Sequence, residues 1–206
     1  MVSEGKVKCC IFDMGGVIMM YSNPQIVQNF QVMGGGRVAE QVAQMDIGAL
    51  TVEEFVETAP PDSIENKLMA GAKDRPFEEL LGGMHRDENF KKCLSVLREN
   101  GIKTALLTNN FFYDKLKTRS TIMADLSQFD VVVESCKVGL RKPDPAIYNL
   151  TLERLALKGE DCLFVDDLKV NCSGAEAVGI KSVHVNCGDT EAAVKEIGQL
   201  VGLDIM

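Results

Sequence analysis

The stretch Val7-Lys-Cys-Cys-Ile-Phe-Asp13-Met-Gly-Gly-Val17 indicates the fold, because it joins a short apolar run to an acidic residue followed by two glycines. The run from Val7 to Phe12 is short, largely apolar and does not alternate with polar residues. Such a run is typical of a strand buried on both faces, as in a parallel sheet. Asp13 then stands at the carboxyl end of the strand, where open α/β sheets bind their ligands.

Further runs and intervening helical patterns extend this interpretation. Strand-like runs recur at Ile102–Leu107, Val131–Val133, Cys162–Val165 and, more weakly, Ser182–Val185. Helical patterns with caps or breakers at their ends cover Glu88–Glu99, Pro145–Leu157 and Thr190–Val201. Strands that alternate with helices predict the α/β class, with a doubly wound parallel sheet and right-handed crossovers.

The stretch after the first strand has a different character. It lacks strand-like runs and carries short helical patterns, including a capping-box sequence from Thr51 to Glu54. We therefore predict that residues 20–85 form a small helical cap lobe, and that residues 1–19 and 86–206 form the α/β core.

Composition limits the classes of function. A chain of 206 residues suits one core domain with a small extra lobe. Its net charge of −8 argues against a nucleic-acid partner, which would need clustered basic residues. The seven cysteines are odd in number and form no CxxC pair, which favours a reducing compartment without structural zinc. We find neither a signal peptide nor a membrane span, and expect a soluble, cytoplasmic protein without a membrane partner. The oligomeric state is left open.

Polar groups follow each predicted strand and should meet at one edge of the sheet. The groups are Asp13-Met-Gly-Gly, Thr108-Asn109-Asn110, the segment around Lys142-Pro-Asp-Pro145, and Asp166-Asp167. Together they supply a carboxylate nucleophile or ligand, a hydroxyl, a lysine and a carboxylate pair. This set suits phosphoryl transfer through a carboxylate with the help of a hard cation.

In this order, the four segments resemble the four motifs of the haloacid dehalogenase superfamily. The phrases that carry the resemblance are Phe12-Asp-Met-Gly-Gly-Val17, Leu107-Thr-Asn109, Lys142-Pro-Asp-Pro145 and Phe164-Val-Asp-Asp167. Within this superfamily, the four segments resemble the phosphatase-like group that includes the N-terminal domain of soluble epoxide hydrolases. The resemblance implies a Mg²⁺-dependent phosphohydrolase that acts on a small phosphorylated metabolite.

The resemblance also implies roles for individual residues. Asp13 would attack phosphorus and form an aspartyl-phosphate. Thr108, Asn109 and Lys142 would bind the phosphoryl group, and Lys142 would also neutralise charge on Asp13. The Mg²⁺ ligands would be drawn from Asp13, the carbonyl of Gly15, Asp166 and Asp167, while residues 20–85 would shield the site and select the substrate.

Gly15 departs from the family pattern, in which this position usually carries a second Asp that protonates the leaving group and activates water. Losing such a group costs on the order of 10²–10⁴-fold in rate. We therefore expect slow turnover, a preference for good leaving groups, or no turnover. Two alternatives remain beside the phosphatase: an inactive homologue that serves as an interaction module, which Gly15 favours, and a metal-independent dehalogenase, which the carboxylate pair at Asp166-Asp167 disfavours.

Overall fold

The computed structural model describes residues 7–22, 36–60, 62, 79 and 83–206. Its centre is a five-stranded parallel sheet with the strand order β5-β4-β1-β6-β7. The strands are β1 (Cys9–Phe12), β4 (Lys103–Thr108), β5 (Val131–Glu134), β6 (Cys162–Asp166) and β7 (Lys181–His184). They lie where the sequence predicted them, and the α/β fold class is confirmed.

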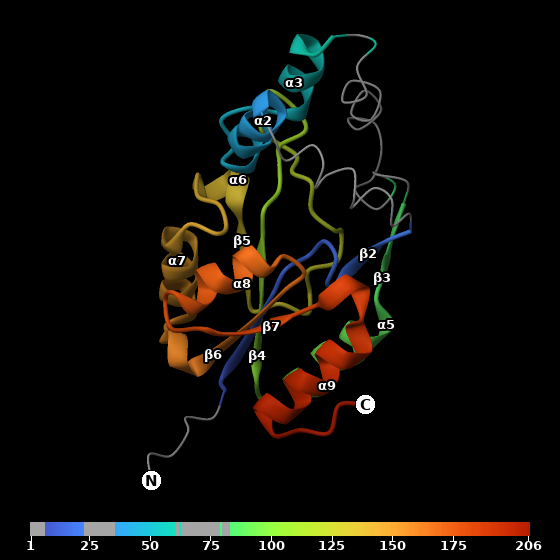
Figure 1. Cartoon of the computed structure of the whole chain (residues 1–206), viewed down its shortest axis with the longest axis vertical. Coiled ribbons are helices and arrows are strands. Elements are labelled where there is room, and N and C mark those ends of the chain that lie inside the picture. Colours follow the sequence, from blue (N-terminus) through green and yellow to red (C-terminus); the bar gives the residue numbers. More distant parts are fainter. Residues whose placement is uncertain (1–6, 23–35, 61, 63–78, 80–82) are drawn as a thin grey trace.

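Helices cover both faces of this sheet (Figure 1). One face is covered by α5 (Glu88–Glu99) and α9 (Thr190–Val201), the other by α7 (Pro145–Leu155) and α8 (Lys169–Glu176). In β1, Phe12 belongs to the first core cluster and Ile11 to the second, because successive side chains of a strand point to opposite faces. Burial on both faces explains why the strands are apolar without alternation.

Local signals set the helix boundaries. Asp144 caps α7, since its Oδ1 accepts a hydrogen bond from the N–H of Ala146 at 2.8 Å. The helix ends at Leu155, two residues earlier than predicted, because Ala156 takes a left-handed conformation with a φ of 54°. A short helix, α6 (Ser135–Val138), and the helix α8 were not predicted. Two 3-10 turns, Gly159–Asp161 and Asn186–Gly188, complete these connections.

The predicted cap region lies partly outside the described residues. Two of its helices are described, α2 (Gly36–Asp46) and α3 (Val52–Thr58). The capping box is present, because Thr51 and Glu54 exchange side-chain and backbone hydrogen bonds at the start of α3. The expectation that this region lacks strands was wrong at its ends. There β2 (Met19–Tyr21) and β3 (Met84–Arg86) pair antiparallel.

The helices α2 and α3 are attached to loops of the core. The N–H groups of Val52 and Glu53 donate to the carbonyls of Phe112 and Tyr113, at 2.9 and 3.0 Å. The helix α2 contacts α6 beyond the end of the sheet, as Figure 1 shows. This end of the sheet is also where the strands finish, so α2 and α3 stand on the side on which ligands bind in such folds.

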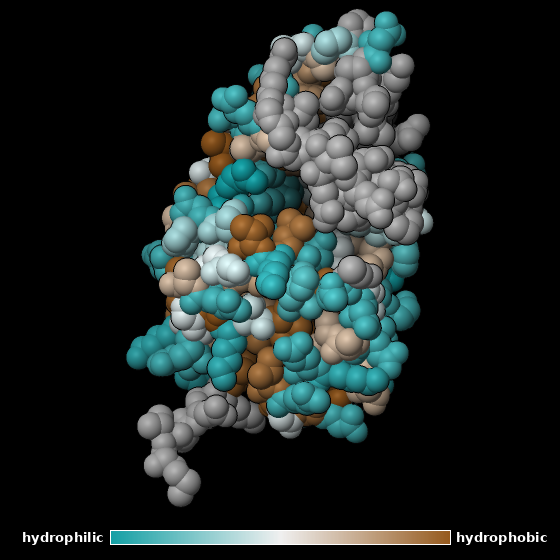
Figure 2. Space-filling view, viewed as in Figure 1, coloured by the Kyte–Doolittle hydropathy of each residue, from teal (hydrophilic) through white to brown (hydrophobic). Residues whose placement is uncertain are grey.

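The surface is mixed in polarity. Figure 2 shows a face on which hydrophilic residues predominate and hydrophobic residues gather in smaller patches. Within the part of the chain that the structure describes, no helix combines the length and the apolar character needed to span a bilayer.

Candidate active site

The site lies where the strand order reverses. From β1 the chain continues to β4 and β5 on one side, and then returns to β6 on the other side of β1. Such a switch point opens a crevice beyond the carboxyl ends of the two strands. Asp13 directly follows β1 and its N–H donates to the carbonyl of Val165 at 2.9 Å, while Asp166 ends β6. The two aspartates therefore flank the crevice, as the sequence predicted.

A buried lysine joins them. The Nζ of Lys142 lies 2.9 Å from Oδ1 of Asp13 and 2.6 Å from Oδ2 of Asp166, although the loop after α6 carries it from far along the chain. Only 1% of the Lys142 side chain is exposed. Burial alone would lower the pKa of this ammonium, but the two carboxylates raise it above its ordinary value. Lys142 therefore stays a cation and cannot act as a base near neutral pH.

The carboxylate of Asp166 is fully engaged. Besides Lys142, it accepts hydrogen bonds from the N–H of Leu168 at 2.8 Å and from Nδ2 of Asn171 at 3.0 and 3.2 Å. These donors use both carboxylate oxygens, so Asp166 has little capacity left for a further ligand. Its geometry suits a residue that holds Lys142 and the start of α8 in place.

Asp167 is placed against the loop that follows Asp13. Gly16 has a φ of +73°, and a Cβ at this position would overlap the carboxylate of Asp167. Only glycine permits both the left-handed backbone and this close approach. On the other side, Nε2 of His184 donates to the carbonyl of Asp167 at 2.9 Å. A carboxylate oxygen of Asp167 lies within 4.8 Å of one of Asp13.

Three carboxylates around one ammonium leave the site with an excess of negative charge. Burial, and then the neighbouring carboxylates of Asp13 and Asp166, raise the pKa of Asp167 to about 8. Burial likewise raises the pKa of Asp13 to about 6, although Lys142 acts to lower it. Opposite charge is therefore needed before both carboxylates can ionise fully at neutral pH.

The donor set fits a hard divalent cation. Carboxylate oxygens of Asp13, Asp166 and Asp167 lie within 4.8 Å of one another. Oxygen ligands of this kind suit Mg²⁺, which prefers a few carboxylates and keeps several waters. Since Asp166 is already engaged, Asp13 and Asp167 offer the available carboxylate oxygens.

Thr108 and Asn109 stand at the end of the neighbouring strand, and their side chains make different contacts. Thr108 is buried, and its hydroxyl makes one hydrogen bond with the described residues, a long contact of 3.4 Å to the carbonyl of Asn109. The side chain of Asn109 is bound to the backbone of Lys142: Oδ1 accepts from its N–H at 2.9 Å and Nδ2 donates to its carbonyl at 3.0 Å. The Asn109 amide thus fixes the loop that carries Lys142.

Several residues near the site carried no recognisable signal in the sequence. Tyr21 brings its hydroxyl against the backbone of Gly15, where a Cβ would lie 2.6 Å from that oxygen. Asp46, at the end of α2, forms a 2.9 Å ion pair with Arg141, the neighbour of Lys142. Burial raises the pKa of Asp46 to about 7, although Arg141 acts to lower it. Contacts between such distant segments leave no local pattern to read.

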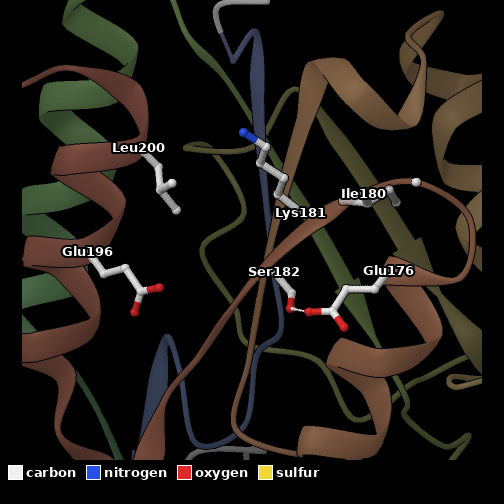
Figure 3. Close-up of a pocket in the computed structure, with 7 residues that line it drawn as sticks. Glu176, Ile180, Lys181, Ser182, Glu196 and Leu200 are labelled. Atoms are coloured by element: carbon white, nitrogen blue, oxygen red, sulfur yellow. Dashed lines mark hydrogen bonds between the residues drawn. The ribbon is translucent and has the colours of Figure 1, made fainter. Parts of the chain in front are cut away.

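A separate groove lies beside the edge strand β7, away from the site. It is formed by α8, β7 and α9 and contains Lys181, Glu196 and Leu200 (Figure 3). On its wall opposite Glu196 and Leu200, the Ser182 hydroxyl donates to Glu176 at 2.5 Å. The groove adjoins the amino end of β7, whereas Asp13 and Lys142 lie beyond the carboxyl ends of the strands, so the groove is not part of the crevice.

A family model described as haloacid dehalogenase-like hydrolase matches residues 7–179. This range includes the four strand-end segments, from Asp13 to Asp167. The chain belongs to this family. The family resemblance inferred from the four strand-end segments is therefore confirmed, and so is the assignment of the protein to the hydrolases.

Curated relatives share parts or all of this haloacid dehalogenase-like chain. It is 42% identical to acyl-CoA dehydrogenase family member 10 of Mus musculus over 55% of this chain and 10% of the relative. It is 33% identical to bifunctional epoxide hydrolase 2 of Sus scrofa over 63% of this chain and 24% of the relative. The chain thus spans a quarter or less of these two proteins. A sesquiterpene phosphatase of Aspergillus oryzae is 29% identical over 95% of this chain and 97% of its own length.

Solved structures share the fold. A predicted HAD-like family hydrolase from Porphyromonas gingivalis superposes with a TM-score of 0.67 at 20% identity, covering 97% of this chain and 100% of the other. An HAD family enzyme from Bacteroides thetaiotaomicron, in complex with magnesium and inorganic phosphate, gives a TM-score of 0.60 at 20% identity, covering 89% and 96%. At these identities the likeness concerns the fold alone.

Proposed function

We propose that this protein is a Mg²⁺-dependent phosphohydrolase that acts on a small phosphorylated metabolite through an aspartyl-phosphate on Asp13. One observation carries the proposal: the Asp13 carboxylate is paired with the buried ammonium of Lys142 and lies within metal-ligating distance of Asp167. A carboxylate nucleophile beside a fixed cation and a hard-cation site is the arrangement that phosphoryl transfer requires. The relative named as a sesquiterpene phosphatase supports this reaction class.

The proposed reaction assigns a step to each of these protein groups. An oxygen of Asp13 attacks phosphorus, the ester oxygen leaves with a proton, and water then cleaves the acyl phosphate. Lys142 neutralises charge on Asp13 and on the phosphoryl oxygens, while Asp166 and Asn109 hold Lys142 at its two ends. The hydroxyl of Thr108 is available to donate to a phosphoryl oxygen, since its contact with the described part of the chain is a long one.

Asp13, Asp167 and the carbonyl of Gly15 would hold the Mg²⁺. When bound, this ion stabilises the negative charge of the phosphoryl oxygens. Asp166 contributes indirectly, because Lys142, Leu168 and Asn171 already use its oxygens. The sequence predicted that Asp166 and Asp167 both coordinate the metal; we propose instead that Asp167 coordinates it and that Asp166 holds Lys142.

Residues 20–85 are proposed to form the cap of the site. The ion pair between Asp46 and Arg141 supports this placement, because it ties α2 to the residue directly before Lys142. The hydrogen bonds from the start of α3 to Phe112 and Tyr113 add a second attachment. A lobe in this position would exclude water from the crevice and contact the part of the substrate beyond the phosphate.

The test is phosphate release from p-nitrophenyl phosphate and from a panel of metabolite phosphates, with Mg²⁺ and with chelator. Asp13→Asn serves as the matched variant, since it keeps the shape of the side chain and removes the nucleophile. We expect release that requires Mg²⁺ and disappears in Asp13→Asn, while the melting temperature shows that the variant is folded. Release that persists in the variant or in chelator would refute the proposal. Absence of release from every phosphate would favour the inactive homologue.

A further inference from the structure

The place of the missing acid/base side chain at Gly15 is filled. The backbone of Gly15 lies outside the left-handed region, so its conformation would accept any side chain. Among the described residues, a Cβ built there would meet Tyr21, whose hydroxyl oxygen would be 2.6 Å away and whose Cζ would be 3.5 Å away. This hydroxyl thus stands about as far from the Cβ position as the carboxylate oxygen of an aspartate would.

Backbone contacts fix the position of Tyr21. It ends β2, where it pairs with Met84 of β3. The loop from Asp13 to β2 is closed by two hydrogen bonds, from Met19 N–H to the Met14 carbonyl and from Gly16 N–H to the Met19 carbonyl, both at 2.8 Å. The phenol and the proposed nucleophile are therefore held by one short, tightly bonded segment.

The position of the hydroxyl, and not only its presence, suits proton transfer. Because its oxygen lies 2.6 Å from the Cβ position of residue 15, Tyr21 offers a proton at the place from which the usual aspartate would act.

We propose that the Tyr21 hydroxyl takes over the acid/base role that Gly15 cannot perform; this inference rests on the proposed phosphohydrolase function. As Asp13 attacks phosphorus and the P–O ester bond breaks, the phenol proton passes to the leaving oxygen, which departs as an alcohol. The resulting phenolate then takes a proton from the water that attacks the aspartyl-phosphate. Phosphate is released, and both Asp13 and Tyr21 return to their starting states.

The test compares leaving groups. Alkyl phosphates need a proton on the leaving oxygen, whereas p-nitrophenol leaves readily as an anion. For Tyr21→Phe we expect kcat on alkyl phosphates to fall on the order of 10²-fold, with a much smaller loss on p-nitrophenyl phosphate and little change in KM. Tyr113→Phe is the matched control, since Tyr113 is a buried tyrosine of the cluster around α3. It should retain both activities.

A rescue pair tests the position itself. Removing the Tyr21 hydroxyl opens the space next to residue 15, so Gly15→Asp combined with Tyr21→Phe should recover turnover of alkyl phosphates. Gly15→Ala combined with Tyr21→Phe fills the same space without an acid and should not recover it. The Mg²⁺-induced rise in melting temperature should persist in Tyr21→Phe, which shows that the site is intact.

The outcomes separate this inference from the proposed function. If wild-type release depends on Asp13 and Tyr21→Phe turns over alkyl phosphates at the wild-type rate, the role of Tyr21 is refuted and the phosphohydrolase stands. An equal loss on both classes of substrate, without rescue by Gly15→Asp, would also refute it, because a purely structural defect does not depend on the leaving group. If Asp13→Asn keeps wild-type release, both proposals fail.

Discussion

Replacing Lys142 by methionine should reveal how strongly one buried ammonium supports the site. Methionine has a similar length and no charge, so the change deletes the cation with little change in packing. The Nζ of Lys142 lies 2.9 Å from Asp13 and 2.6 Å from Asp166. Its removal leaves two buried carboxylates without their common partner.

The magnitude follows from the burial of these groups. The exposed fractions of the side chains are 1% for Lys142, 12% for Asp13 and 0% for Asp166, so water screens the pair weakly. Breaking one partner of a buried ion pair costs about 3–5 kcal/mol. For a domain of this size, that corresponds to a melting temperature lower by about 6–20 °C.

The assay is urea denaturation of wild type and Lys142→Met in chelator at pH 8 and pH 5. Without Lys142, the folded-state pKa of Asp13 should rise further above its unfolded value. A carboxyl group with a raised folded pKa destabilises the fold increasingly as pH rises through the interval between the two values. The stability loss should therefore be largest at pH 8 and smaller at pH 5.

Lys115→Met is the matched control. Lys115 pairs with Glu57 at 2.7 Å, but both side chains are about half exposed, at 46% and 57%. Exposed pairs contribute about 0–1 kcal/mol, so this variant should stay near wild type. A loss below about 1 kcal/mol for Lys142→Met at pH 8, or a loss that grows as pH falls, would refute the reasoning.

Three further predictions concern the surroundings of the site. Asp167→Asn should abolish the stabilisation of the protein by Mg²⁺ in thermal melts. The pKa of Asp167 is about 8, so its carboxyl group is largely protonated near pH 7 before the metal binds. Calorimetry of the wild type near pH 7 should therefore detect proton release on Mg²⁺ binding. Asn109→Ala should lower kcat about tenfold or more at nearly unchanged Mg²⁺ affinity, since it frees the backbone of Lys142; unchanged kinetics would contradict this role. Arg141→Gln should destabilise the protein more at pH 8.5 than at pH 5 in urea titrations. The pKa of its buried partner Asp46 is about 7, so the negative charge that Arg141 neutralises develops as the pH rises. Equal losses of stability at both pH values would contradict this role of Arg141.

The sequence fixes the order of the core elements through short-range physics. A strand buried on both faces must be apolar throughout, and a helix must carry its caps next to it, so β1 and α7 can be recognised locally. The parallel sheet also brings Asp13 and Asp166 to one edge, because carboxyl ends of parallel strands align. The placement of Asp13 and of the carboxylate pair at this edge was therefore predictable.

The sequence revealed less about the region between β1 and α5. Its strands β2 and β3 are three residues each and pair with one another across a long separation in the chain. The periodicity of the local sequence therefore cannot predict such a pair. Its helices α2 and α3 are held by contacts with core loops, such as that between Asp46 and Arg141.

Tertiary structure alone decided which partners each site residue contacts. Asp166 and Asp167 are equivalent in the sequence, but strand geometry turns Asp166 toward Lys142 and Asn171, and leaves Asp167 facing Asp13. Gly15 signified a missing group in the sequence, whereas in three dimensions the Tyr21 hydroxyl fills its place. The sequence thus determined which chemical groups reach the edge of the sheet. Packing between distant segments determined their partners, because hydrogen bonds and ion pairs depend on distances that the order of residues does not encode locally.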